Sequence, residues 1–140
     1  MSPAENKALI QHLVHEVWDE ASTSAVHDYF AAPLRPEVLR HHAEILAALS
    51  GVRVHILDLI AEGDTVAARL MVSGTHDKGP FAGQPPTQKR LAWGSFRFYR
   101  IEGQQVVETW AMQERLGLMQ QPGLVPTTVG AVHWAAGAAE

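Results

Sequence analysis

The sequence has no cysteine, little net charge and no long apolar run. Without cysteine, disulfides, thiolate nucleophiles and cysteine-based metal sites are excluded. No segment approaches the ~20 apolar residues of a membrane-spanning helix, and residues 1–12 lack the basic and apolar regions of a secretory signal. Basic residues are scattered and the formal charge is −4, which disfavours nucleic acid and anionic membranes as partners. We therefore expect a cytoplasmic protein.

What the chain does have is the composition of one globular domain. Of its 140 residues, 46% are hydrophobic and 19% charged, a balance typical of a soluble protein. A chain of this length buries about two-thirds of the surface that its unfolded form exposes. We predict a single domain over residues 1–123 and an Ala/Gly-rich C-terminal tail over residues 124–140.

The first part of the sequence has the periodicity of helices. Apolar side chains recur every four residues (Leu9, Leu13, Val17), which predicts an amphipathic helix. A break with good N-cap residues follows at positions 21–24, and Gly51 suits the end of a later helix. The predicted helices are Asn6–Glu20, a short helix after residue 24 that carries Tyr29, and Glu37–Leu49.

From residue 52 onward the pattern alternates with a period of two, which is typical of strands. Two tight turns centre on Gly63 and Gly103, and residues 77–88 are a Gly/Pro-rich loop. The predicted strands are Val52–Ala61, Thr65–Thr75, Arg90–Ile101 and Val106–Glu114. Helices first and an antiparallel meander second predict an α+β fold, with helices packed on one face of a curved sheet that encloses a pocket.

Several segments together resemble a known family. The runs ENKALIQHLVHEVWDE, VRVHILDLIAEGDTVAARLMVSGTH, FAGQPPT and VVETWAMQERLGLMQQPG are similar to the SnoaL-like polyketide cyclases, over Asn6–Pro33 and Val52–Gly123. The resemblance implies the cone-shaped nuclear transport factor 2-like fold, which serves cyclases, isomerases, epoxide hydrolases and non-catalytic binders. It also implies a homodimer that forms through the exposed sheet face, for which the predicted outward residues are Arg53, His55, Leu57 and Leu59.

The family pattern E-x-W-x-x-x-D marks a general base, and it is altered here. Glu108 and Trp110 match the pattern, and Glu114 stands in place of the aspartate. The resemblance therefore implies that Glu114 is the base, with a carboxylate displaced by one methylene. The segment Ala31–Pro36 is shorter than its family counterpart and has no room for the strand and loop that the family usually has here. We therefore expect a reshaped pocket and a different substrate from that of the aromatic polyketide cyclases.

Strand parity extends the candidate site around Glu114. Trp110 and Met112 share the parity of Glu114, so they would line the pocket and partly desolvate its carboxylate, which favours a base near neutral pH. Arg97 and Tyr99 share parity with Trp93, and they would stabilise an oxyanion in the pocket. The alternatives are a solvent-exposed Glu114, a buried ion pair for Arg97 and a core position for Tyr99.

Four further polar and aromatic residues each allow two interpretations of their role. His76 is a general acid or a turn residue that fixes the loop, and Asp58 is a second pocket acid or the partner of Arg69. Trp18 and Tyr29 line the pocket or the core. The histidine pairs at 12/15 and 41/42 have no clear third ligand, so we predict no metal site.

The sequence thus predicts an enzyme without metal or organic cofactor. Glu114 would take a proton next to a carbonyl of a small apolar, polyketide-like molecule, and Arg97, Tyr99 or His76 would stabilise the oxyanion during aldol-type ring closure, a cyclase reaction of the isomerase or lyase kind. One alternative is an epoxide hydrolase or epoxide-opening cyclase of the limonene epoxide hydrolase type. The other is a pericyclic shape catalyst or a hydrophobic ligand binder.

Overall fold

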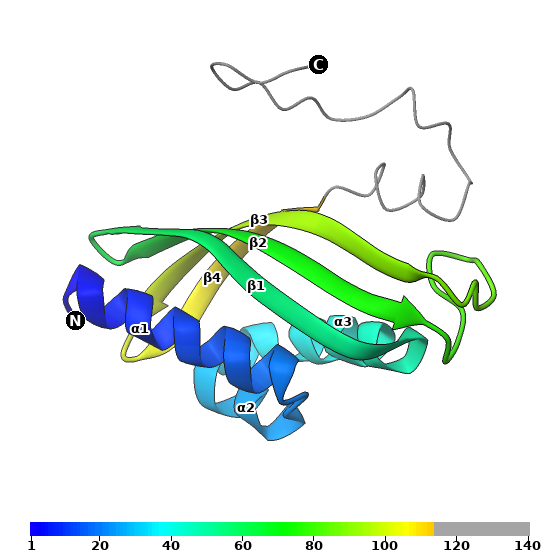
Figure 1. The fold of residues 1–140 in the computed structure, drawn as a ribbon. Coiled ribbons are helices and arrows are strands. Elements are labelled where there is room, and N and C mark those ends of the chain that lie inside the picture. Colours follow the sequence, from blue (N-terminus) through cyan, green and yellow to red (C-terminus); the bar gives the residue numbers. More distant parts are fainter. Residues whose placement is uncertain (114–140) are drawn as a thin grey trace, which may run out of the picture.

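The computed structural model describes residues 1–113, which form helices packed beneath a curved sheet (Figure 1). In chain order the elements are α1 (Pro3–Val14), the π-helical turn η1 (His15–Asp19), α2 (Thr23–Tyr29), the 3₁₀ turn η2 (Ala32–Leu34), α3 (Arg35–Ala48), β1 (Leu49–Glu62), β2 (Thr65–His76), β3 (Arg90–Glu102) and β4 (Gln105–Gln113). Within this part of the chain, no helix is long and apolar enough to cross a membrane.

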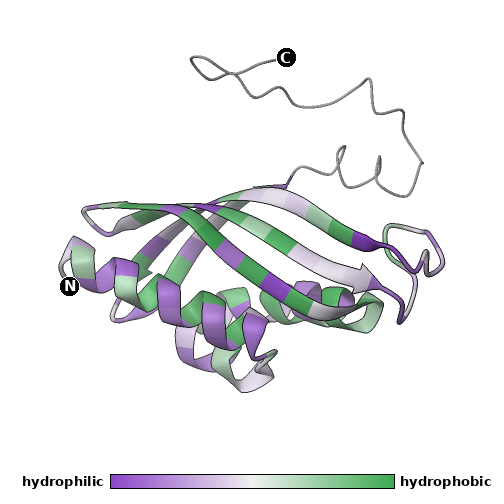
Figure 2. Cartoon of the chain, viewed as in Figure 1, coloured by the Kyte–Doolittle hydropathy of each residue, from purple (hydrophilic) through white to green (hydrophobic). Residues whose placement is uncertain are grey.

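The four strands form one antiparallel meander in the order β1-β2-β3-β4. All helices of residues 1–113 lie on one face of this sheet, and no described element covers the opposite face, which we call the open face (Figure 1). Along the strands apolar and polar residues alternate, which is visible as green and purple bands (Figure 2). This arrangement confirms the predicted α+β fold, because segregated helices bury the apolar face of an antiparallel sheet.

The first helix starts earlier than predicted, and its last turn is not α-helical. Ser2 caps it by accepting a hydrogen bond from the Glu5 amide (3.1 Å), and the Glu5 carboxylate accepts one from the Ser2 amide (3.3 Å). This capping box starts α1 at Pro3, which suits the first helical position. The predicted continuous helix then ends at Val14, and the last turn widens into η1.

Two buried clusters hold the helices to the sheet. The larger cluster joins the helices to the end of the sheet where β1 turns into β2 and β3 turns into β4. Its fully buried members include Ile10, Leu13, Val26, Val66 and Val106. The smaller joins α3 to the other end through Ile45, Leu49, Leu91 and Trp93. Each buried side chain of this size contributes about 1.5–3 kcal/mol, so these clusters fix the position of the sheet over the helices.

Two β-bulges invert the side-chain alternation that the sequence predicts. The pairing of β1 with β2 shifts between Ile56 and Asp58, and the pairing of β3 with β4 shifts between Arg100 and Ile101. Each bulge adds one residue to a strand, so every later side chain of that strand changes face. In β1, Leu59 consequently packs against the core and Ile60 is 67% exposed, which corrects the expectation that Leu59 faces outward.

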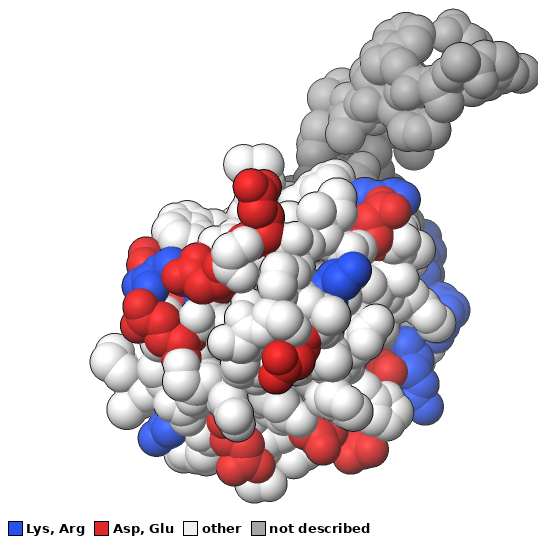
Figure 3. Space-filling model, turned by 90° about the vertical axis from the view of Figure 1, so that its left-hand side faces the viewer, with Lys and Arg blue, Asp and Glu red and all other residues white. Residues whose placement is uncertain are grey.

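Charged side chains are mixed on the surface. On the face drawn in Figure 3, acidic groups are spread among neutral ones, and Lys and Arg gather mainly toward one edge. This distribution fits the formal charge of −4.

Candidate active site

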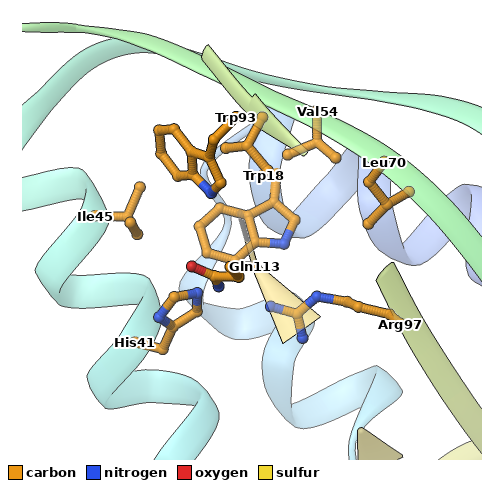
Figure 4. A pocket seen from close by; sticks show the side chains of 9 residues that line it. Trp18, His41, Ile45, Val54, Leu70, Trp93, Arg97 and Gln113 are labelled. Carbon is orange, nitrogen blue, oxygen red and sulfur yellow. The ribbon is translucent and has the colours of Figure 1, made fainter. Parts of the chain in front are cut away.

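A hollow of about 330 Å³ lies between the helices and the inner face of the sheet. A narrow end of about 20 Å³ adjoins it, and Trp18, His41, Arg97 and Gln113 line both parts. A further hollow of about 470 Å³, next to Phe81, shares His41, Glu44 and Gln113 with the first. The residues of the narrow end surround a common space (Figure 4). A volume of this order suits a small-molecule site.

The helices contribute Trp18 through an unusual turn. Trp18 belongs to η1, and its ring lies against the rings of His41 (5.7 Å) and His42 (5.1 Å). His42 is buried, and its Nε2 donates a hydrogen bond to the Val17 carbonyl (2.7 Å). Because this bond joins α3 to η1, it holds the widened turn and presents the Trp18 indole to the hollow (Figure 4).

Strand β3 places Arg97 and Tyr99 in the hollow, as parity predicts. Arg97 forms no ion pair with any residue of the described range 1–113. Tyr99 is 2% exposed, and burial raises the pKa of its phenol, an effect that the nearby Arg97 charge partly offsets. The Tyr99 hydroxyl therefore stays protonated at neutral pH and is available as a hydrogen-bond donor.

Strand β4 contributes different residues from those predicted. Trp110 and Met112 are 53% and 75% exposed, and they pair across the open face with Phe98 and Phe96. The expectation that they line the pocket is therefore wrong, because the bulge after Arg100 turns them outward. The residues of β4 that line the hollow are Thr109, Ala111 and Gln113. Glu114 lies outside the described residues, so its role as base stays a prediction.

Asp58 is not a pocket acid. It pairs with Arg69 on the open face (2.5 Å), where both side chains are about half exposed. The second reading of Asp58, as the partner of Arg69, is therefore the one that the structure shows, and the bulge at Leu57 is the reason. The epoxide hydrolase alternative loses the second acid that it assigned to this position.

His76 and Tyr29 lie outside the hollow. The His76 Nε2 donates to the Gly79 carbonyl (2.8 Å), and Nδ1 accepts from the Thr87 amide (3.4 Å). Both ring nitrogens thus hold the loop between β2 and β3. His76 therefore has the structural role of a turn residue and not that of a general acid. Tyr29 packs against the core, where burial and a hydrogen bond to Glu16 raise its pKa to about 12.

The remaining predicted residue, Trp93, lines the narrow end. It is 2% exposed, and its Nε1 has no hydrogen-bond partner among the described residues. The Thr109 hydroxyl, which belongs to the wall of the larger hollow, is buried without a partner as well. Unsatisfied donors beside an empty volume are groups that a polar ligand can satisfy.

His41 is the main site residue that sequence reasoning missed, since it lines all three hollows. Its spacing from Val38 and Ile45, three and four residues away on α3, is the signal that could have revealed its inward face. Within residues 1–113, no three His, Asp or Glu side chains converge as metal ligands do.

Comparison with known proteins places this geometry in context. A family model described as SnoaL-like polyketide cyclase matches residues 8–122. A search of curated proteins found no match. Among solved structures, AclR of Streptomyces galilaeus, a proposed hydroxylase, is 25% identical with a TM-score of 0.82, over 89% of this chain and 85% of its own.

Two further solved structures show the same fold. A proposed polyketide cyclase from Acidithiobacillus ferrooxidans is 24% identical with a TM-score of 0.74, over 86% of this chain and 96% of its own. IdmH of Streptomyces antibioticus, also a proposed polyketide cyclase, is 19% identical with a TM-score of 0.73, over 88% and 99%. At these identities the likeness concerns the fold.

Proposed function

Because the chain belongs to the SnoaL-like polyketide cyclase family, we propose that it closes a ring in a small polyketide-like molecule by acid–base chemistry. The observation that carries this proposal is an Arg97 side chain without an ion pair in the described range, next to a protonated Tyr99, inside a hollow under the sheet. A permanent cation and a phenol donor stabilise negative charge that forms on oxygen.

The walls of the hollow suit a flexible apolar chain. Leu13, Val17, Phe30 and Val38 face the space, together with the Trp18 indole. These side chains exclude water and hold two reacting carbons of one ligand close together, an effect that supplies several kcal/mol in intramolecular reactions.

The reaction that we propose conserves its proton. A base removes a proton next to a carbonyl, and the resulting enolate carbon bonds to a second carbonyl carbon of the same molecule. The second carbonyl becomes an alkoxide, which takes the proton back. Arg97 and Tyr99 donate hydrogen bonds to the enolate oxygen, and the proposed base is Glu114, which stands in place of the aspartate of the family pattern.

Proton exchange tests this chemistry without the natural substrate. We expect the wild-type protein to accelerate deuterium uptake at the α-carbon of an aryl β-keto ester in D₂O, followed by proton NMR. Arg97→Gln should slow this exchange by about 10²–10³-fold, as the loss of one oxyanion donor does. Arg69→Gln, on the open face, is the matched control and should retain the wild-type rate. No acceleration by the wild-type protein would leave a ligand binder or a shape catalyst.

We also propose that the open sheet face forms a homodimer with a second copy. The patch consists of large apolar side chains that are 44–75% exposed, namely Leu57, Ile60, Phe96, Phe98, Trp110 and Met112. Phe98 lies opposite Trp110 and Phe96 opposite Met112 across β3 and β4, so the patch is continuous there. Exposed apolar surface of this kind marks an interaction site.

Light scattering of the full chain tests the dimer. We expect two copies per particle at micromolar concentration for the wild-type protein, and a monomer for Trp110→Lys because the charge is costly to bury. Glu108→Lys would add a charge beside the patch but break the pair with Arg100, so Gln105→Lys at the end of β4 is the better control. A wild-type monomer would contradict the proposal.

A further inference from the structure

The narrow end of the hollow has room for about one oxygen atom. Its volume of about 20 Å³ exceeds the ~10–15 Å³ that a single water needs. It adjoins the larger hollow, since Trp18, Arg97 and Gln113 border both. The two parts are therefore close enough for one ligand to place atoms in each.

Two of the groups at the narrow end, Trp93 and Arg97, can only donate hydrogen bonds, whereas His41 and Gln113 can also accept them. The Trp93 Nε1–H can only donate, and it has no partner among the described residues although the side chain is 98% buried. Arg97 adds up to five N–H donors and a permanent positive charge, without an ion pair in residues 1–113. An unsatisfied buried donor is costly, so an acceptor that reaches both groups would be stabilised.

Charge along the hollow is arranged asymmetrically. Glu37 and Glu44 border the larger hollow but not the narrow end. Glu37 is paired with Arg40 (2.5 Å) in the larger hollow, and Arg97 borders both parts, so it is the one charged side chain of the described residues at the narrow end apart from any charge on His41. An anion is thus favoured at the narrow end and disfavoured beside Glu44, which would orient an anionic ligand in one direction only.

We propose that the narrow end is a subsite for a carboxylate carried on a flat apolar ligand. One carboxylate oxygen enters the narrow end and accepts from Trp93 Nε1–H, and the other stays at the border with the larger hollow, where it accepts from Arg97, which lines both parts. The apolar body lies in the larger hollow, which the Trp18 indole also borders. A neutral ester or amide offers Arg97 no charge and should therefore bind more weakly than the carboxylate.

If the protein has the proposed function, this subsite selects a substrate that is a polyketide-like free acid. This identification of the substrate rests on the proposed function. A guanidinium has enough donors to hold a carboxylate and still reach the oxygen of a carbonyl one carbon away. The reacting enolate would then form next to the carboxylate, within reach of Arg97 and Tyr99. The ligand would be a chain whose acid end stays intact during ring closure.

Calorimetric titration with 2-naphthoate and its neutral counterpart 2-naphthamide tests the subsite without turnover. We expect the wild-type full chain to bind the carboxylate about tenfold or more tightly than the amide, as charge-assisted hydrogen bonds do. Arg97→Gln should make the two affinities equal. Trp93→Phe should weaken the carboxylate about three- to tenfold and the amide less, and the retained binding of the amide also shows that the variant is folded.

The controls use the same residue types on the open face. Arg69→Gln and Trp110→Phe should preserve the preference for the carboxylate. Equal binding of both probes by the wild-type protein would overturn the subsite and assign the narrow end to a water molecule. That result would leave α-proton exchange intact, whereas a carboxylate preference without exchange would retain the subsite and remove the cyclase function.

Discussion

Glu114→Gln is expected to slow α-proton exchange by about 10²–10⁴-fold, the contribution that a general base makes. Glutamine keeps the size of the side chain and removes its ability to accept a proton. The family pattern, in which Glu114 stands in place of the aspartate, is the reason for this expectation. Binding of 2-naphthamide should not change, because the substitution acts on the chemical step and leaves the apolar walls in place. Exchange measured by NMR and affinity measured by calorimetry separate these two effects.

His41 is the other candidate for the general base, so the exchange experiment includes variants of both residues. His41→Gln keeps a polar side chain of similar size on α3, and it should slow exchange far less than Glu114→Gln does. Glu114→Asp restores the carboxylate of the family pattern, so it should retain most of the activity. A large loss in His41→Gln together with an active Glu114→Gln would place the base on α3 and contradict the sequence prediction.

The order of helices and strands could be predicted from the sequence because each element carries a local pattern. The period of four before residue 20 and the period of two after residue 52 are both present in the observed elements. The turns at Gly63 and Gly103 could also be predicted, because both glycines adopt the positive φ (58° and 55°) that glycine favours in such turns. These features depend on neighbours in the chain and need no knowledge of tertiary contacts.

The faces of the strands could be predicted only as far as the first bulge. Trp93, Arg97 and Tyr99 lie on an unbulged strand, and parity placed them correctly. Asp58 and Trp110 follow bulges, and both face the side opposite to the predicted one. A bulge is set by the pairing with the neighbouring strand, so the residues of one strand alone do not reveal it.

The position of His42 could not be predicted for a different reason. Neighbouring histidines on a helix point in different directions, and here His41 faces the hollow whereas His42 is buried against η1. The partner of His42 is the carbonyl of Val17, 25 residues earlier, in a turn whose π-helical form has no clear sequence pattern. The contact that positions Trp18 is therefore a tertiary one.

His42→Ala is expected to lower the free energy of unfolding by about 2–4 kcal/mol. The substitution leaves a cavity beside Trp18 and removes the only donor that α3 offers to the Val17 carbonyl in the described range. Urea denaturation followed by circular dichroism measures the change. His12→Ala, on the exposed face of α1, is the matched control and should stay within ~0.5 kcal/mol of the wild-type value.

The same variant separates the stability of the core from the order of the site. If His42 positions η1, the folded fraction of His42→Ala should bind 2-naphthamide more weakly, because the Trp18 indole loses the ring that supports it. A variant that unfolds at lower urea yet binds the amide normally when folded would show that η1 alone positions Trp18. A loss of less than ~1 kcal/mol in unfolding free energy would contradict the role of the buried hydrogen bond itself.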